Sequence, residues 1–112
     1  RAPIAGTVEK VSYIYGKFFN AVKKPETLQC LFQNERNEIL ITGTIKCKVI
    51  QIAGYLARRI ECFVEEKEKV EKGQELGVIN LGSQVALVLP KCILDVKEGD
   101  TINIGETIIA IA

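Results

Sequence analysis

The sequence predicts an all-β protein, a compact barrel or sandwich, and two observations support this prediction. Apolar residues alternate with polar ones over short runs, and helical periodicity is almost absent. Residues 64–79 and 96–111 also form an internal repeat at an offset of 32 residues. Each copy has the pattern of a strand, a charged turn, a short strand, a glycine-containing turn and a further strand. We expect residues 1–112 to form a single domain around one modest core.

The remaining elements can be placed in order along the chain. An opening strand is expected over 2–8, and a half-buried strand with partly bulged spacing continues to Tyr15. Residues 16–26 are expected to form a basic loop, because Gly, Asn and Pro interrupt the pattern there. After this loop we expect a polar turn at 34–37. Three strands are then expected, at 38–42, 45–52 and 55–64.

Composition excludes several classes of function. The 15 Lys and Arg residues nearly balance the 14 Asp and Glu residues, so the net charge of +1 favours neither nucleic acid nor an anionic membrane. Histidine is absent, which removes the usual general base and makes a zinc site unexpected. The cysteines form no close CxxC pair, and we expect small buried thiols in a reducing cytosol, with a disulfide as the less favoured alternative. They are Cys30, Cys47, Cys62 and Cys92.

One uncharged stretch, Leu76–Pro90, stands out between two highly charged segments and carries Gly82-Ser83 in its middle. It is too short for a membrane-spanning helix, which needs about 20 apolar residues, and we expect it to be buried. One interpretation of the Gly-Ser pair is a turn or bulge inside a core strand. The other is a self-cleaving bond whose serine becomes a covalent pyruvoyl group. The Gly-Ser pair alone favours the turn, but its position between the two repeat copies is specific.

Short blocks spread over the whole chain resemble, in order, those of one enzyme family. They are Arg1-Ala2-Pro3-Ile4, Gly16-Lys17-Phe18, Asn34-Glu35-Arg36-Asn37, Gln51-Ile52-Ala53-Gly54, Arg58-Arg59-Ile60, Glu71-Lys72-Gly73-Gln74, Gly82-Ser83, Leu89-Pro90 and Lys97 with Gly99-Asp100. The ordered set is similar to phosphatidylserine decarboxylase proenzymes, in particular to their short, archaetidylserine-decarboxylase-like branch. No single block is specific, but the set as a whole is.

The resemblance implies a reaction and a covalent cofactor. The bond between Gly82 and Ser83 would be cleaved by the serine itself, giving a β chain (1–82) and an α chain (83–112). Glycine before the serine removes side-chain crowding and permits strained backbone angles. Ser83 would become a pyruvoyl group, which forms a Schiff base with the amine of the serine headgroup and accepts electrons as carbon dioxide leaves. Phosphatidylserine would thus become phosphatidylethanolamine.

Further residues are candidates for contact with the lipid. Arg58 and Arg59 point to opposite faces of a strand, and either of them, or Arg36, is expected to bind the lipid phosphate. Phe18 and Phe19 stand in a basic loop and either pack onto the core or face the membrane. We therefore expect a peripheral enzyme at the cytoplasmic face of the cell membrane, with a phospholipid partner and no metal. A homodimer is plausible, because an uncovered sheet edge needs a partner.

Some features depart from the family, and two other classes stay open. Family members carry an upstream His and Asp that this chain lacks; it begins at Arg1 without Met, so we expect a fragment with little processing of its own. Gln84 follows the serine where relatives often have Arg or Thr, which leaves substrate preference open. One alternative is a non-enzymatic carrier or adaptor of the barrel-sandwich-hybrid type. Its candidate modifiable lysines (Lys67, Lys69 and Lys72) lie among Glu and Lys without a neighbouring Met. The other alternative is an inactive lipid-binding relic.

Overall fold

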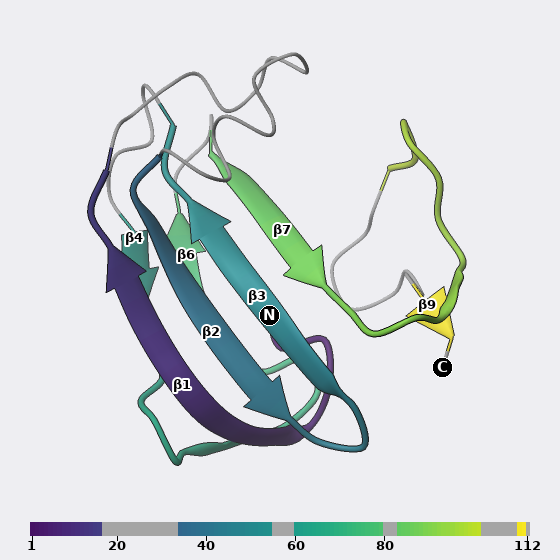
Figure 1. Cartoon of the computed structure of the whole chain (residues 1–112), viewed down its shortest axis with the longest axis horizontal. Coiled ribbons are helices and arrows are strands. Elements are labelled where there is room, and N and C mark those ends of the chain that lie inside the picture. Colours follow the sequence, from purple (N-terminus) through teal and green to yellow (C-terminus); the bar gives the residue numbers. More distant parts are fainter. Residues whose placement is uncertain (17–33, 55–59, 80–82, 102–109, 112) are drawn as a thin grey trace.

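The described residues form strands and contain no helix, which confirms the predicted all-β class. The computed structural model describes residues 1–16, 34–54, 60–79, 83–101 and 110–111 (Figure 1). The strands are β1 (Gly6–Ile14), β2 (Arg36–Thr42), β3 (Lys46–Ile52), β4 (Ile60–Cys62), β5 (Lys69–Val70), β6 (Gly77–Ile79), β7 (Gln84–Val88), β8 (Ile93–Leu94) and β9 (Ala110–Ile111). No helix in this part of the chain is long and apolar enough to cross a membrane.

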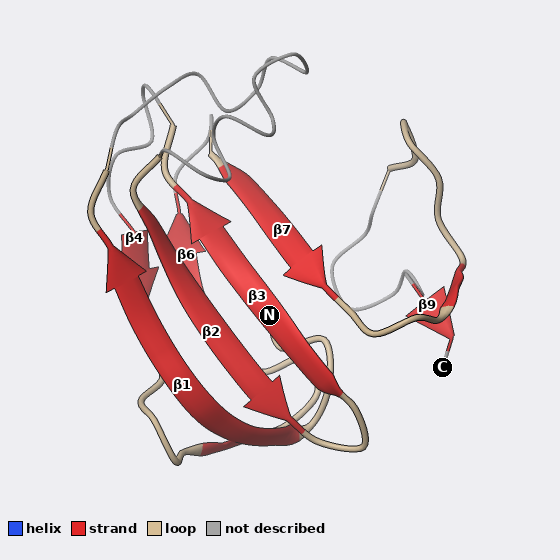
Figure 2. Ribbon diagram, in the orientation of Figure 1, coloured by secondary structure: helices blue, strands red, loops and turns tan. Residues whose placement is uncertain are grey.

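A curled antiparallel sheet makes up most of the molecule. Its strand order is β5-β1-β2-β3-β7, and the pair β4–β6 lies against one face of it, so that together they form a half-barrel (Figures 1 and 2). β-Branched residues at alternating positions suit such a pleated, half-buried surface. The bulged spacing predicted for β1 is confirmed, because its register with β2 shifts between Val8 and Lys10.

The core lies between the sheet and the first repeat copy. In β2 buried side chains alternate with half-buried ones, whereas residues 49–52 of β3 are all buried and Val8 is the one buried residue of β1. The first repeat copy supplies the facing layer. The buried cluster comprises Ala2, Val8, Ile39, Ile41, Cys47, Val49, Val64, Val70 and Leu76.

The internal repeat is confirmed in the hydrogen bonds of its charged turns. Glu65 N–H donates to Glu68 Oε1 at 3.3 Å, and in the second copy Lys97 N–H donates to Asp100 Oδ2 at 2.9 Å. In each turn the residue before that acid has a positive φ, 72° at Lys67 and 93° at Gly99. The strand pairs differ by one residue in register, since Ile60 pairs with Ile79 and Ile93, instead of Cys92, pairs with Ile111. The β8–β9 pair lies apart from the large sheet (Figure 1).

The expected polar turn at 34–37 is wrong. Arg36 begins β2, and the side chains of Asn34 and Asn37 are completely or almost completely buried. Their amide groups reach partners on β3 and just beyond it, so burial leaves those groups hydrogen-bonded. Because these partners lie far along the chain, the four polar residues look like a turn in the sequence.

The expected burial of the uncharged stretch 76–90 is correct only in part. Leu76 is buried, but Val85 and Val88 on β7 are each more than half exposed. The physical reason is that β7 is the last strand of its sheet and, within the described residues, nothing pairs with its outer edge. The expectation of buried thiols likewise holds for Cys47 and fails for Cys62, which is exposed near the surface end of β4.

Candidate functional site

Ser83 lies at a junction between the two parts of the half-barrel. Strand β6, which ends at Ile79, belongs to the small sheet, whereas β7 begins at Gln84 in the large sheet. The segment between them therefore crosses from one sheet to the other, and Ser83, half-buried, is its last residue. Gly82 lies outside the described residues. Ser83 thus lies where the chain, having left the small sheet, enters the large sheet.

Strand pairing brings Arg36 to the same end of the strands as Ser83. We call this end of the large sheet the edge around Ser83. Arg36 pairs with Ile52, and Ile52 in turn pairs with Gln84. Cross-strand partners project to the same face, so these three side chains form one row. With strands spaced about 4.8 Å apart, Arg36 is two strands away from Gln84, roughly 10 Å.

The guanidinium of Arg36 is largely engaged. Its Nε donates to Glu38 Oε2 at 3.0 Å, and its Nη1 donates to the Asn34 carbonyl at 3.2 Å. Lys48 Nζ lies 3.3 Å from the other oxygen of Glu38. Burial acts to raise the pKa of Glu38, but the hydrogen bonds and charges of Arg36 and Lys48 outweigh it and lower that pKa. Within the described part of the chain, Arg36 Nη2 has no hydrogen-bond partner and remains a possible donor to an anion.

Polar residues at the ends of β2 and β3 hold this edge in place. Asn34 Nδ2 donates to the Ala53 carbonyl at 2.6 Å, and Ala53 N–H donates to the Glu35 carbonyl at 3.0 Å. Tyr13 Oη donates to the Glu35 carboxylate, and burial together with that carboxylate raises the pKa of Tyr13 to about 12. Sequence reasoning missed this group, apart from the similarity of the 34–37 block to the family.

A second polar chain fixes β4 and β6 beneath the sheet. Asn37 Nδ2 donates to Gln51 Oε1 at 3.0 Å, and Gln51 Nε2 donates to the Glu61 carbonyl on β4 at 3.4 Å. Gly77 begins β6 directly against this group: a Cβ there would overlap the Glu61 carbonyl oxygen and come within 2.7 Å of Gln51 Nε2. The strand that leads toward Ser83 is therefore held close to the sheet, and no pattern of residue types indicates this.

Gln84, the residue after Ser83, carries an unsatisfied acceptor. Its Oε1 atom is buried and has no hydrogen-bond partner among the described residues. A buried polar atom without a partner costs about 1–3 kcal/mol, so it is uncommon in a native fold. The sequence singled out Gln84 only as a departure from the family pattern, whereas in the fold it is a free acceptor next to the candidate cleavage site.

The other predicted site residues cannot be placed against this edge. Phe18, Phe19, Arg58 and Arg59 lie outside the described residues, as Gly82 does. Among described residues, no cluster of three or more His, Cys, Asp or Glu side chains could hold a metal ion.

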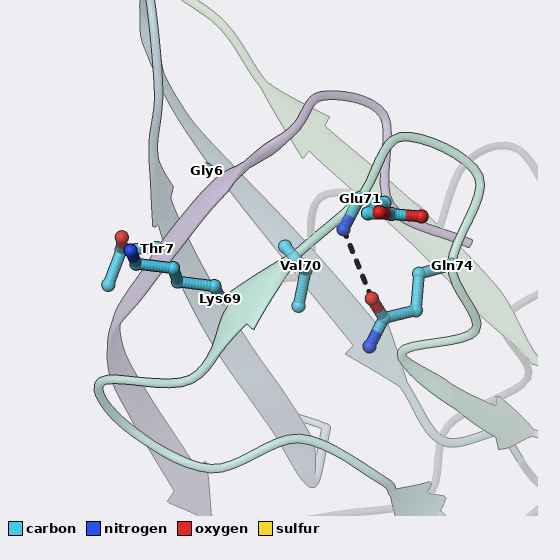
Figure 3. A pocket seen from close by; sticks show the side chains of 6 residues that line it. All are labelled: Gly6, Thr7, Lys69, Val70, Glu71 and Gln74. Atoms are coloured by element: carbon cyan, nitrogen blue, oxygen red, sulfur yellow. Dashed lines mark hydrogen bonds between the residues drawn. The ribbon is translucent and has the colours of Figure 1, made fainter.

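Two shallow hollows on the surface lie elsewhere. The first is lined by Gly6, Thr7, Lys69, Val70, Glu71 and Gln74, where β1 begins beside β5 (Figure 3). The second is lined mainly by apolar groups of the β2–β3 hairpin and the segment after β7, including Ile45, Leu89 and Pro90. Neither is lined by Arg36, Ser83 or Gln84, although Lys48, the ion-pair partner of Glu38, lines the second.

Comparison with known proteins first defines the class, a group of decarboxylase proenzymes. A family model described as phosphatidylserine decarboxylase matches residues 1–110. The chain therefore belongs to the phosphatidylserine decarboxylase family, as the ordered blocks of the sequence predict. No solved structure matches the chain.

Curated relatives agree with this assignment. The chain is 44% identical to the phosphatidylserine decarboxylase proenzyme of Gluconobacter oxydans, covering 98% of this chain and 48% of the relative. It is 40% identical to the proenzyme of the same name from Desulfotalea psychrophila, covering 97% and 50%. It is 43% identical to the putative archaetidylserine decarboxylase proenzyme of Methanothermobacter thermautotrophicus, covering 98% and 48%. The chain thus spans about half the length of the curated relatives it matches.

Proposed function

We propose that these residues are part of a pyruvoyl-dependent decarboxylase that converts phosphatidylserine to phosphatidylethanolamine. The observation that supports the proposal is the position of Ser83: in a chain of this family that carries a Gly-Ser pair, Ser83 lies immediately before β7. The residues after the bond are held by pairing with β3, while the residues before it come from the other sheet. A break at this bond therefore separates the chain between two independently paired strands.

Self-cleavage would begin with Ser83. Its hydroxyl oxygen attacks the Gly82 carbonyl carbon, and the peptide nitrogen leaves, so that an ester replaces the peptide bond. Loss of the Ser83 α-proton then expels the Gly82 carboxylate and leaves dehydroalanine. Water converts this residue to the pyruvoyl group and releases ammonia. The products are residues 1–82, with an ordinary carboxyl terminus, and residues 83–112, with no free amino terminus.

The edge around Ser83 fits a pyruvoyl group at residue 83. That group would supply an electrophilic carbonyl that takes up the electrons released with carbon dioxide. The unsatisfied Gln84 Oε1 offers an acceptor immediately beside it. Arg36, held by Glu38 and Asn34, presents Nη2 to the lipid phosphate, and Arg58 and Arg59 are further candidates for this contact.

The lipid substrate implies a peripheral location at the cytoplasmic face of the cell membrane. In this proposal the rings of Phe18 and Phe19 insert into the membrane surface, and the neighbouring lysines contact the lipid headgroups. Cosedimentation with phosphatidylserine vesicles tests this part. A protein with both phenylalanines changed to Ser should bind vesicles at least about tenfold more weakly. Unchanged binding would show that these two rings pack elsewhere.

The carrier alternative has less support. Lys67 does occupy an exposed turn, but its N–H donates to the Val8 carbonyl at 2.6 Å, so the turn is docked on β1. A modifiable lysine of a carrier needs a turn that can reach a partner's active site. Membership of the decarboxylase family also gives no reason to expect such a modification.

Intact-mass measurement of the full-length protein tests the proposal. The expected result is two species, one ending at Gly82 and one beginning with a blocked residue 83. Ser83→Ala should abolish the cleavage and the release of carbon dioxide from phosphatidylserine. Ser12→Ala, at the only other serine of these 112 residues, is the matched control and should leave both intact. A single uncleaved mass in a folded full-length protein that still decarboxylates would refute the pyruvoyl mechanism.

A further inference from the structure

The two repeat copies present the same turn, but among the described residues a strand is docked on the first copy alone. In the first copy, Lys67 N–H donates to the Val8 carbonyl at 2.6 Å, and Val8 N–H donates to the Glu68 carbonyl at 2.8 Å. From there the pairing continues along β1 and β5, with Thr7 opposite Lys69 and Gly6 opposite Val70 (Figure 3). The docked segment thus covers the turn and the short strand that follows it.

The docked segment also reaches the second turn of the first copy. Ala2 N–H donates to the Gln74 carbonyl at 2.7 Å, and Gly73 N–H donates to the Ala2 carbonyl at 2.8 Å. Ala2 and Val8 are both buried by this contact, and so is Val64 at the start of the copy. A complete unit of this repeat therefore consists of its own turns and strands plus one extended segment from elsewhere in the chain.

The second copy lacks that segment among the described residues. At the offset of 32, Gly99 N–H and the Asp100 carbonyl correspond to the two groups that bind Val8 in the first copy. Neither group has a hydrogen-bond partner in the described part of the chain. Residues 97–101 are exposed, and Val96, the counterpart of buried Val64, is only half-buried. In the first copy the equivalent backbone groups bind an extended segment, and exposed backbone groups are a template for such a segment.

We infer that the turn at 97–100 and the following Thr101 form a docking edge for an extended strand from the part of the full-length protein outside these 112 residues. Val96, half-buried, directly precedes this edge in the sequence, and Ile93 on β8 is 70% exposed. The docked strand therefore carries an aliphatic residue at the position that Val8 has in the first copy. The inference uses family membership only for chain length and does not depend on the pyruvoyl chemistry.

The rest of the same chain is favoured over a second copy as the source of the strand. The curated relatives are about twice as long as this chain, which covers 48% and 50% of two of them, so additional residues exist to supply a strand. A covalently linked segment also acts at a high effective concentration, which a separate molecule lacks. In the first copy the docked segment likewise comes from the same chain.

Hydrogen exchange in the full-length protein tests the docking edge. Lys67 is the internal reference, since its amide is already bonded to Val8. We expect the Gly99 amide to exchange at least about tenfold more slowly than a free peptide amide, independent of protein concentration. Exchange of Gly99 at the free rate, with Lys67 protected, would overturn the inference. Protection that disappears on dilution would assign the edge to a second copy and overturn the proposed source.

Disulfide trapping provides a second measurement. Thr101 corresponds to Lys69 in the first copy, and Lys69 lies opposite Thr7. Thr7→Cys with Lys69→Cys is therefore the positive control and should form a disulfide. Thr101→Cys should form disulfides with cysteines introduced along one segment outside these 112 residues, at every second position. A working control with no such segment would contradict the inference.

Discussion

Asn37 and Gln51 face each other across β2 and β3, and Asn37 Nδ2 donates to Gln51 Oε1 at 3.0 Å. Both side chains are buried beneath the sheet, and Gln51 passes the connection on to the Glu61 carbonyl of β4. The half-barrel is therefore joined to its covering strands by a polar chain as well as by apolar contacts. Because the Asn37–Gln51 link is buried, removing one of these side chains leaves the other without its hydrogen bond.

This arrangement predicts a non-additive pair of substitutions. Asn37→Ala should lower the free energy of unfolding by about 2–3 kcal/mol, because Gln51 Oε1 then stays buried without a donor. Replacing both residues by Ala should cost clearly less than the sum of Asn37→Ala and Gln51→Ala, because the double change leaves neither amide group of the pair buried alone. Urea unfolding of the two single variants and the double variant measures the coupling. Strict additivity would show that the hydrogen bond contributes little.

The fold class could be predicted because its signals are local. Alternation within a strand depends on near neighbours in the sequence. The repeat of 64–79 at 96–111 can be read directly by comparing two stretches of sequence, without knowledge of contacts. The roles of Asn34 and Asn37 could not be predicted, since their partners Ala53 and Gln51 become neighbours only when β2 pairs with β3.

The candidate site likewise has features that the sequence predicts and features that depend on the fold. Gly82-Ser83 was found because a short motif and the resemblance to a family point to it. The exposure of β7 depends on its place at the edge of the sheet, and the unsatisfied Gln84 Oε1 depends on packing in three dimensions. No pattern of residue types encodes either property.

The repeat predicts that Lys67 is a strained position. Lys67 has φ 72°, whereas the corresponding residue in the second copy is Gly99 with φ 93°. A left-handed conformation costs a residue with a Cβ about 1–2 kcal/mol, and changing Lys67 to glycine removes this cost. Part of the resulting stabilisation is lost, because glycine has more conformational freedom in the unfolded chain. Lys67→Gly should therefore stabilise the protein by about 0.5–1 kcal/mol in urea unfolding, by the difference between these effects.

The reverse substitution in the other copy is the control for this prediction. Gly99→Lys should destabilise by a similar amount, although nothing lies within 4 Å of a Cβ at that position. If both substitutions were neutral, backbone conformation would not limit either turn.

The lowered pKa of Glu38 predicts a loss of stability in acid. Burial opposes the charged form, but Arg36 and Lys48 favour it, so the folded-state pKa lies below the ordinary value of 4.5. The stabilisation is then present above pH 4.5 and is lost as the pH falls through the folded-state pKa. Glu38→Gln should be less stable than the wild-type protein at pH 7, and the difference should shrink below pH 4.5. A difference that stays constant from pH 7 to pH 3 would show that the ion pairs do not contribute.

Arg36 offers a test of phosphate binding in the proposed reaction. Arg36→Lys keeps a positive charge but loses the planar donor group that Nη2 belongs to. We expect KM for phosphatidylserine to rise about tenfold with kcat nearly unchanged. Lys48→Arg, at the other cation on Glu38, is the control and should leave KM unaltered. A fall in kcat alone would assign Arg36 to the stability of the edge and not to the lipid.

We expect that Gln84 lowers the stability of the fold and promotes cleavage of the Gly82–Ser83 bond. Its Oε1 has no partner in the described part of the chain, so Gln84→Leu should leave the free energy of unfolding unchanged or raise it by about 1–2 kcal/mol. The same variant should slow the appearance of the 83–112 product in a time course of intact masses. Gln74→Leu is the matched control, because Gln74 Oε1 accepts from Glu71 N–H at 3.0 Å and lies away from Ser83. It should destabilise the protein without slowing cleavage. If Gln84→Leu instead destabilises the protein and cleaves at the normal rate, its acceptor has a purely structural partner in the full-length protein.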